Sequence, residues 1–202
     1  MRRIVILTVL LIVAALLIPE AMVANPTLIA EFAPGKNWND VIVPNGADLD
    51  GTGDYVSTLD AAAHDIVGDI EVRGRHTPTD NTPGAPMVLG AKWNTVSDER
   101  SWKATLETDG KIQVEHSTDG TAGNTVTQKS TVPVGFTDGV TWWWAFVIDV
   151  STGLMTAYWH ANPNVPPAAL ADWDTSTTVA GSATSIYAGT ALVTVGADAE
   201  GN

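Results

Sequence analysis

The sequence predicts an all-β protein, a sandwich of antiparallel sheets preceded by an N-terminal hydrophobic segment. Short β-like runs recur from residue 55 onward, and turn residues separate them. One run, 142–150, is largely apolar on both faces and is followed by a turn and a second run, which indicates a hairpin inside a two-layer fold. With 202 residues, 45% of them hydrophobic, the chain is long enough for one substantial core.

The N-terminal segment is separate from the predicted sandwich. Arg2 and Arg3 precede an apolar run over 4–18, and a polar end follows. A basic start, an apolar middle and a polar end are typical of a secretory signal. We therefore expect residues 1–24 to direct export, either as a cleaved signal peptide or as an uncleaved membrane anchor helix, and both alternatives stay open.

The predicted strands follow in order after residues 25–45, which are expected to be a linker or a first strand. The strands are expected over 55–59, 69–76, 87–93, 102–107, 111–116, 125–132, 142–150 and 154–160, with a last apolar run over 191–195. Asp-Gly pairs mark reversals of the chain at 109–110, 119–120 and 138–139.

Two other segments have different expectations. Residues 59–66 favour a short helix, because Asp60 can serve as the N-cap before three alanines, and 168–173 favour a further helical turn. Residues 175–185 are rich in Ser, Thr, Ala and Gly, and we expect them to form a surface loop.

The Trp-rich run predicts a central strand that is buried on both faces. Alternation places Trp142 and Trp144 on one face, with Phe146 and Ile148, and places Trp143 on the other. The face of Trp143 also carries a small alanine and an aspartate, so Trp143 is either packed or part of a ligand surface.

Charge and cysteine content exclude several classes of function. The chain has 10 Lys plus Arg against 23 Asp plus Glu, a net charge of −13, and its basic residues are scattered. Nucleic acid is therefore not expected as a partner, because phosphate backbones are held by clustered Lys and Arg. With no cysteine, the chain has neither disulfides nor thiolate metal sites, so the fold must rest on its core.

The order of several motifs resembles the laminin-G-like, concanavalin A-like jelly-roll modules of bacterial surface and phage proteins. The motifs are Gly-Thr-Gly-Asp-Tyr-Val at 51–56, Gly-Asp-Ile-Glu-Val-Arg at 68–73, Leu-Gly-Ala-Lys-Trp at 89–93, Arg-Ser-Trp at 100–102, Thr-Asp-Gly-Lys-Ile at 108–112 and Ser-Thr-Asp-Gly-Thr at 117–121. The Trp-rich run and the closing segments at 186–192 and 195–196 fit the same order. The resemblance covers residues 46–202.

This resemblance implies a jelly-roll sandwich over 46–202 and a non-catalytic, exported module that binds carbohydrate or mediates surface adhesion. The expected partner is a polysaccharide or glycoprotein surface, and the expected location is secreted or at the cell surface, with membrane contact only through 1–24. The alternative is a structural or virion-associated assembly protein. Members of the family usually continue past the Val-Gly segment, so we expect a sandwich without its last strands, whose unpaired edge can support self-assembly.

Exposed aromatic rings are platforms for sugar rings, and nearby polar groups orient the sugar. The candidate ligand-binding residues are Trp93, Arg100, Trp143, Trp159 and Trp173. Trp38 and Trp173 are expected to be exposed because loop residues flank them, whereas Trp102 is expected to face inward. For each tryptophan the alternative is packing in the core.

A calcium site is predicted in the acidic, glycine-containing segment 48–54. Asp48, Asp50 and Asp54 offer carboxylate oxygens, which calcium prefers, on a flexible turn. The modules that the chain resembles often carry calcium at one rim of the sandwich. The alternative is an acidic turn that precedes a strand.

The sequence does not predict an enzyme. Glycosidases of this shape carry paired carboxylates on one strand, and the Glu-x-Asp-x-x-Glu pattern is absent. The four histidines show no i, i+4 pairing, and no serine lies in a nucleophile elbow. A glycoside hydrolase stays a remote alternative.

Overall fold

The computed structural model describes residues 42–43, 46–47, 49, 54–162, 164, 167–179, 181 and 184–198. The chain divides into two units, Met1–Asp48 and Leu49–Asn202. In the first unit, β1 (Ile42–Val43) pairs antiparallel with β2 (Gly46–Ala47). The predicted signal or anchor helix lies outside the described residues. Within the described part of the chain, no helix has the length and apolar character needed to cross a bilayer.

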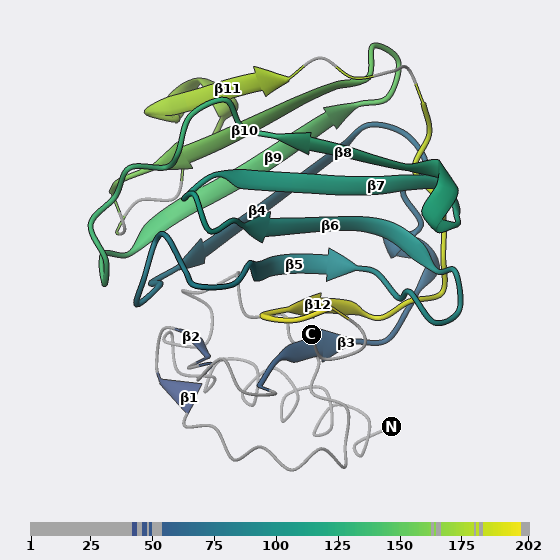
Figure 1. The fold of residues 1–202 in the computed structure, drawn as a ribbon, viewed down its shortest axis with the longest axis horizontal. Coiled ribbons are helices and arrows are strands. Elements are labelled where there is room, and N and C mark those ends of the chain that lie inside the picture. Colours follow the sequence, from purple (N-terminus) through teal and green to yellow (C-terminus); the bar gives the residue numbers. More distant parts are fainter. Residues whose placement is uncertain are drawn as a thin grey trace, which may run out of the picture. The chain divides into compact units, whose positions relative to one another are not determined.

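The second unit is an antiparallel β-sandwich, which confirms the predicted all-β class and is consistent with a jelly roll (Figure 1). One sheet has the strand order β11-β10-β9-β4, with β4 (Ile70–His76), β9 (Trp142–Asp149), β10 (Leu154–His160) and β11 (Thr175–Val179). The other has the order β3-β12-β5-β6-β7-β8 and lies in front of the first in Figure 1. Its strands are β3 (Val56–Thr58), β5 (Met87–Lys92), β6 (Arg100–Leu106), β7 (Ile112–Gly120), β8 (Thr125–Lys129) and β12 (Val193–Val195).

The core lies between the two sheets, and β9 supplies its largest side chains. Strand β9 pairs with β10 on one side and β4 on the other, so it is central in its sheet. The side chains of Trp142, Trp144 and Phe146 are buried in the main core. Across the sandwich, Trp102 of β6 meets Phe146 with ring centroids 5.7 Å apart. The predictions of a doubly buried central strand and of an inward Trp102 are confirmed.

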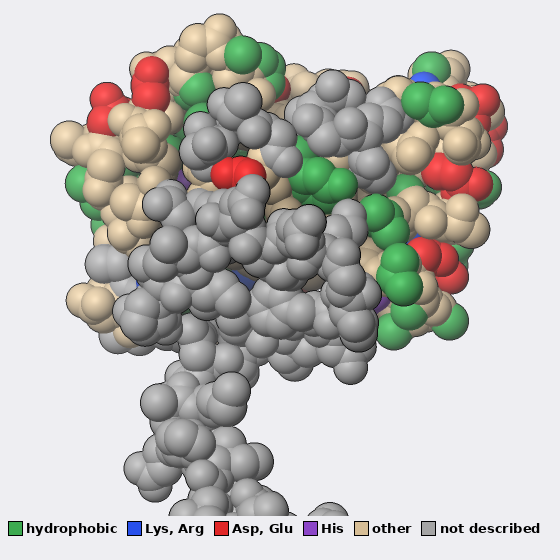
Figure 2. All heavy atoms as spheres, turned by 90° about the horizontal axis from the view of Figure 1, so that it is seen from below, with side chains coloured by type: hydrophobic (Ala, Val, Ile, Leu, Met, Phe, Trp, Pro, Cys, Tyr) green, Lys and Arg blue, Asp and Glu red, His purple; other side chains and the backbone are tan. Residues whose placement is uncertain are grey.

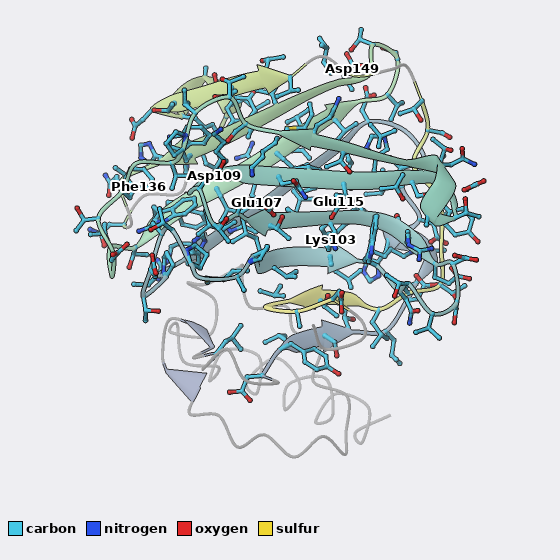
Figure 3. The ribbon with its side chains drawn as sticks, in the orientation of Figure 1. Lys103, Glu107, Asp109, Glu115, Phe136 and Asp149 are labelled. Carbon is cyan, nitrogen blue, oxygen red and sulfur yellow. The ribbon has the colours of Figure 1, made fainter. Side chains whose placement is uncertain are left out.

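The turn between β9 and β10 is held by one carboxylate. Asp149, labelled in Figure 3, accepts hydrogen bonds from the Ser151 amide at 3.0 Å, the Ser151 hydroxyl at 2.6 Å and the Thr152 amide at 3.2 Å. Gly153 follows with a φ of 69°, a conformation that glycine adopts without steric cost. These bonds fix the hairpin that the sequence predicts at this point.

Two predicted elements differ from the structure. Residues 175–179, expected in a loop, form strand β11, which pairs with β10 over five residues. Threonine is β-branched and suits a half-exposed strand. The composition of 175–179 is therefore compatible with a loop or a strand, and pairing with β10 makes the segment a strand. The expected helix over 59–66 is the 3-10 turn η2 (Ala62–His64), whose N-cap Ala61 has no side-chain hydrogen bond. Asp60, expected as the cap, forms an ion pair with Lys92 instead.

Two further short helices among the described residues connect strands. Turn η3 (Ala122–Asn124) joins β7 to β8, and η4 (Leu170–Asp172) precedes β11. The latter agrees with the helical turn predicted over 168–173.

At one end of the core, a half-buried histidine packs against the Trp-rich strand, and both of its ring nitrogens are buried. The ring of His76, the last residue of β4, lies 4.1 Å from the Trp142 ring in an edge arrangement, and Phe136 packs against the same tryptophan at 5.3 Å. Burial lowers the pKa of His76 from 6.5 to about 3. Burial likewise lowers the pKa of His116, which faces the core from β7.

A first prediction concerns Gly74, which lies opposite Trp144 in the β4–β9 ladder. A Cβ at position 74 would lie 2.5 Å from two ring carbons of Trp144. Because Trp144 is buried and has no room to move, Gly74→Ala should lower the free energy of unfolding by about 2 kcal/mol in urea denaturation. Gly68→Ala is the control, since nothing lies within 4 Å of that position. Equal stability of both variants would contradict this packing.

A second prediction concerns acid. The unfolded chain protonates His76 below pH 6.5, whereas the folded chain resists protonation until about pH 3. The folded state is therefore not penalised by His76 above pH 6.5, and it loses stability progressively as the pH falls from 6.5 toward 3, where the unfolded chain binds a proton that folded His76 does not. His76 alone should make the protein about 2 kcal/mol less stable at pH 5 than at pH 7, as measured by denaturation. His76→Phe should flatten this dependence, and an unchanged pH profile in that variant would refute the assignment.

Candidate ligand-binding face

The outer face of the four-stranded sheet carries the strongest constellation of polar and aromatic side chains. Because side chains alternate along a strand, the residues between the core positions of β4, β9 and β10 point away from the core. In one row across the sheet, Arg73 lies opposite Ala145, which lies opposite Tyr158. In the next row, Arg75 lies opposite Trp143. We call Arg73, Arg75, Trp143, Tyr158 and Trp173 the aromatic–arginine face.

The last member, Trp173, comes from the segment 167–174, which runs over this sheet. Trp173 packs with Trp143 and Ala145 in a second hydrophobic cluster, separate from the main core. Small Ala145 leaves room for the indole. Tyr158 flanks Trp173 at a centroid distance of 6.0 Å, and Leu170 packs against the same cluster.

Two guanidinium groups complete the face. The Arg73 guanidinium carbon lies 5.8 Å from the Trp173 ring centroid, and that of Arg75 lies 5.7 Å from the Trp143 ring centroid. Both distances are within the range of cation–π attraction. Arg73 also donates to the carbonyl oxygens of Pro167 at 2.6 Å and Ala168 at 3.4 Å, and pairs with Glu71. Arg73 therefore fastens the covering segment to β4.

The far end of the segment is fastened by Asp174. Its carboxylate lies 2.8 Å from Nδ1 of His160 and accepts the Ala161 amide at 3.1 Å. Within the segment, Asp172 accepts the Ala169 amide at 2.8 Å and closes turn η4. Trp173 is thus held between two anchored points.

The indole N–H groups of Trp143 and Trp173 are buried and have no hydrogen-bond acceptor among the described residues. In the main core, by contrast, Trp142 donates its N–H to Asn81 at 3.0 Å. A buried donor without an acceptor costs roughly 1–3 kcal/mol. The oxygen of a ligand could remove that cost, once Arg75 or the covering segment shifts to admit it.

Beside the aromatic cluster, the same face is open and polar. The hydroxyl groups of Thr156 on β10 and Thr178 on β11 lie 3.2 Å apart. Ser176 and Thr178 are exposed, and Tyr158 and Val147 are half-buried. The half-buried Tyr158 and Val147, next to these hydroxyl groups, offer the two kinds of contact that a saccharide uses, apolar surface and hydrogen-bonding groups.

The structure brings together two of the five predicted ligand-binding residues, Trp143 and Trp173. Trp159 lies in the main core and is 2% exposed. Trp93 follows β5 in the other sheet, with the Lys103 ammonium 5.0 Å from its ring centroid. Arg100 is buried and donates to the carbonyls of Thr95 and Gly120, so it anchors a loop. A ligand role for Trp143 and Trp173 stays a prediction.

The expectation that Trp173 is exposed is wrong, because its side chain is 9% exposed. Loop residues flank it in sequence, but the loop folds back onto the sheet and buries the ring. Trp38, for which the same expectation was made, lies outside the described residues, as do Asp48 and Asp50 of the predicted calcium site. Asp54 is described and half-buried. Within the described part of the chain, no group of three acidic or histidine side chains is placed to hold a metal.

Sequence reasoning missed Arg73, Arg75 and Tyr158. The signal was present in the alternation of charged residues with Ile70, Val72 and Gly74, which predicts a strand with one charged outer face. The alternation does not predict which residues lie next to the two arginines in the folded chain. In the structure, Arg73 lies beside Trp173 and Arg75 lies beside Trp143.

The outer face of the six-stranded sheet is different in character. Lys103, Glu107, Asp109 and Glu115, labelled in Figure 3, lie along it. Lys103 pairs with Glu115 at 3.2 Å, and Lys129 pairs with Asp109 at 3.1 Å and with Glu107 at 3.6 Å. These charges satisfy one another, which is the ordinary state of a solvated sheet face.

No known protein-family model matches the chain, and no curated protein matches it. Among solved structures, the CBM40 module of the Ruminococcus gnavus IT-sialidase is similar in its complex with α2,3 sialyllactose, with a TM-score of 0.40, 10% identity, and coverage of 69% of this chain and 84% of that one. The same module without ligand has a TM-score of 0.38 and 9% identity, and the match covers 66% of this chain and 79% of that one. Its complex with α2,6 sialyllactose has a TM-score of 0.38 and 8% identity, and the match covers 71% of this chain and 92% of that one. Likeness at this level identifies no ligand for this chain.

The anchoring of the covering segment leads to a third prediction. Arg73→Ala removes the hydrogen bonds to Pro167 and Ala168, so amides of 167–174 should exchange with solvent roughly fivefold faster, equivalent to about 1 kcal/mol of local opening. Hydrogen-exchange mass spectrometry measures this change peptide by peptide. Lys103→Ala, on the opposite sheet, should leave exchange in 167–174 unchanged. Unaltered exchange in Arg73→Ala would contradict the anchoring role.

Proposed function

We propose that this chain is a non-catalytic carbohydrate-binding module and that the aromatic–arginine face is its ligand surface. The observation that carries the proposal is the grouping of three aromatic side chains and two guanidinium groups on one outer sheet face, beside a row of hydroxyl groups. The half-buried Tyr158 ring can bind the C–H surface of a sugar ring, and guanidinium and hydroxyl groups bind its oxygens. Trp143 and Trp173 come within reach of a ligand once Arg75 or the covering segment shifts.

The two buried indole N–H groups support the same proposal, since they are hydrogen-bond donors that have no acceptor among the described residues. A saccharide is rich in acceptor oxygens, and a neutral polyol suits a face on which Arg73 already pairs with Glu71. Acidic side chains show at both margins of the view in Figure 2, where basic ones are scarce. This surface charge favours solubility and disfavours polyanions such as nucleic acid.

The proposal extends to the setting in which the module works. We propose that residues 1–24 direct export and that the module attaches to a polysaccharide or glycoprotein surface, with calcium held by Asp48, Asp50 and Asp54. The segment 1–24 has the layout of a secretory signal, and the three aspartates offer the oxygen ligands that calcium prefers.

The test is binding of the purified chain to a panel of polysaccharides, with and without added calcium. Isothermal titration with the best binder should then show roughly tenfold weaker binding for Tyr158→Ala and for Arg75→Ala, equivalent to about 1.4 kcal/mol. Trp173→Phe, which keeps an aromatic ring and removes the N–H, should weaken binding by a smaller factor. Tryptophan fluorescence should change on binding, because two indoles lie in the proposed site.

Lys103→Ala is the matched control, because it removes a surface cation from the opposite sheet. The proposal fails if no polysaccharide binds under either condition. The location of the site fails if Lys103→Ala weakens binding while Tyr158→Ala and Arg75→Ala do not.

A further inference from the structure

A lysine ammonium is buried at the edge of the main core, on the opposite side of the sandwich from the aromatic–arginine face. Lys92 ends β5 and lies opposite Trp102 of β6 and Val193 of β12. Its side chain is 0% exposed. A buried lysine is rare in proteins unless its charge is paired.

Two carboxylates from one short segment close over this ammonium. Lys92 Nζ lies 2.6 Å from Oδ1 of Asp65 and 2.7 Å from Oδ1 of Asp60. It also donates to the carbonyl oxygen of His64 at 3.4 Å. The aspartates flank turn η2, and their side chains are 34% and 26% exposed. One carboxylate is sufficient to neutralise one ammonium, so the second is available for another role.

An amine, an acyl group and a second carboxylate in contact are the components of an amide-forming reaction. We propose that Lys92 and Asp65 condense to an intramolecular isopeptide bond, with Asp60 carrying the proton. Asp65 is assigned as the acyl partner because Nζ donates a hydrogen bond to its Oδ1 at 2.6 Å. The product would tie the η2 segment covalently to β5 in a chain that has no cysteine.

The reaction balances without an added reagent. A proton first passes from the Lys92 ammonium to the Asp65 carboxylate, which gives a neutral amine and a neutral carboxylic acid. Nζ then attacks Cγ of Asp65, and Asp60 takes one proton from the nitrogen and delivers it to the departing hydroxyl. The N–Cγ bond forms, the Cγ–O bond breaks, and one water leaves. Asp60 ends as a carboxylate, as it began.

Two physical effects act on the rate in opposite directions. Burial by itself would lower the pKa of Lys92, but hydrogen bonds to Asp60 and Asp65 outweigh it and raise the pKa. The ion pair is therefore the resting state, and the reaction proceeds slowly through the minor neutral pair. Against this, groups held in contact react with effective molarities of about 10⁵–10⁸ M. Condensation also removes a charge pair whose burial costs free energy.

The test is the mass of the full chain, purified, aged and measured under denaturing conditions, where an ion pair does not survive. The cross-linked chain should be lighter by about 18 Da, the mass of one water. Trypsin should then yield one branched species that joins residues 37–73 to residues 76–100, because modified Lys92 is no longer cleaved. Tandem mass spectrometry should locate the bond at Lys92 and Asp65.

Variants separate this bond from other sources of the same mass loss, since Asp-Gly sites can also lose water as succinimides. Lys92→Arg keeps the positive charge and should abolish the branched species. Asp65→Asn should change the loss to about 17 Da, the mass of ammonia, and Asp60→Asn should slow the reaction severalfold. A chain of full mass with unlinked peptides after prolonged ageing would overturn the proposal and leave an ion pair. A branched species joined through Asp60 would overturn the assignment of Asp65 as the acyl partner.

Discussion

The structure depends on how strand β9 fills the space between two sheets. Trp142, Trp144 and Phe146 project from one face of this strand into the core, and the six-stranded sheet must lie far enough away to accommodate them. The neighbouring strand contributes glycine at position 74, because no side chain fits opposite the Trp144 ring. Close packing of this kind leaves little freedom, so strand register on both sides of β9 follows from the bulk of its side chains.

The same strand also creates the outer face. Alternation along β9 places Trp143 and Ala145 opposite to the core residues, and the small alanine gives the 167–174 segment a place to insert Trp173. Strand β9 therefore supplies large side chains to the core and, on its other side, part of the aromatic–arginine face that we propose as a ligand surface. The rigid core supports the aromatic–arginine face, since a surface on paired strands keeps its geometry better than one on loops.

Three cations, of which Lys92 and Arg100 are buried, anchor loops in this sandwich. Arg73 holds the 167–174 segment through carbonyl groups, Arg100 holds the 94–99 loop, and Lys92 holds the segment around η2. In a chain without cysteine, these contacts hold loops without any disulfide bond. The two buried cations, Lys92 and Arg100, are buried together with the groups that satisfy them, as the cost of burying an unpaired charge requires.

The sequence by itself determined the β-class, most strands, the inward Trp102 and the doubly buried Trp-rich strand, because these follow from alternation and turn chemistry, which act over a few residues. It did not determine strand β11, the burial of Trp173, or the meeting of Arg73 and Arg75 with Trp173 and Trp143. Those depend on which segments become neighbours across the sheet, and only the tertiary structure decided that. The physical reason is that packing of distant segments overrides local preference when it buries apolar area that local structure leaves exposed.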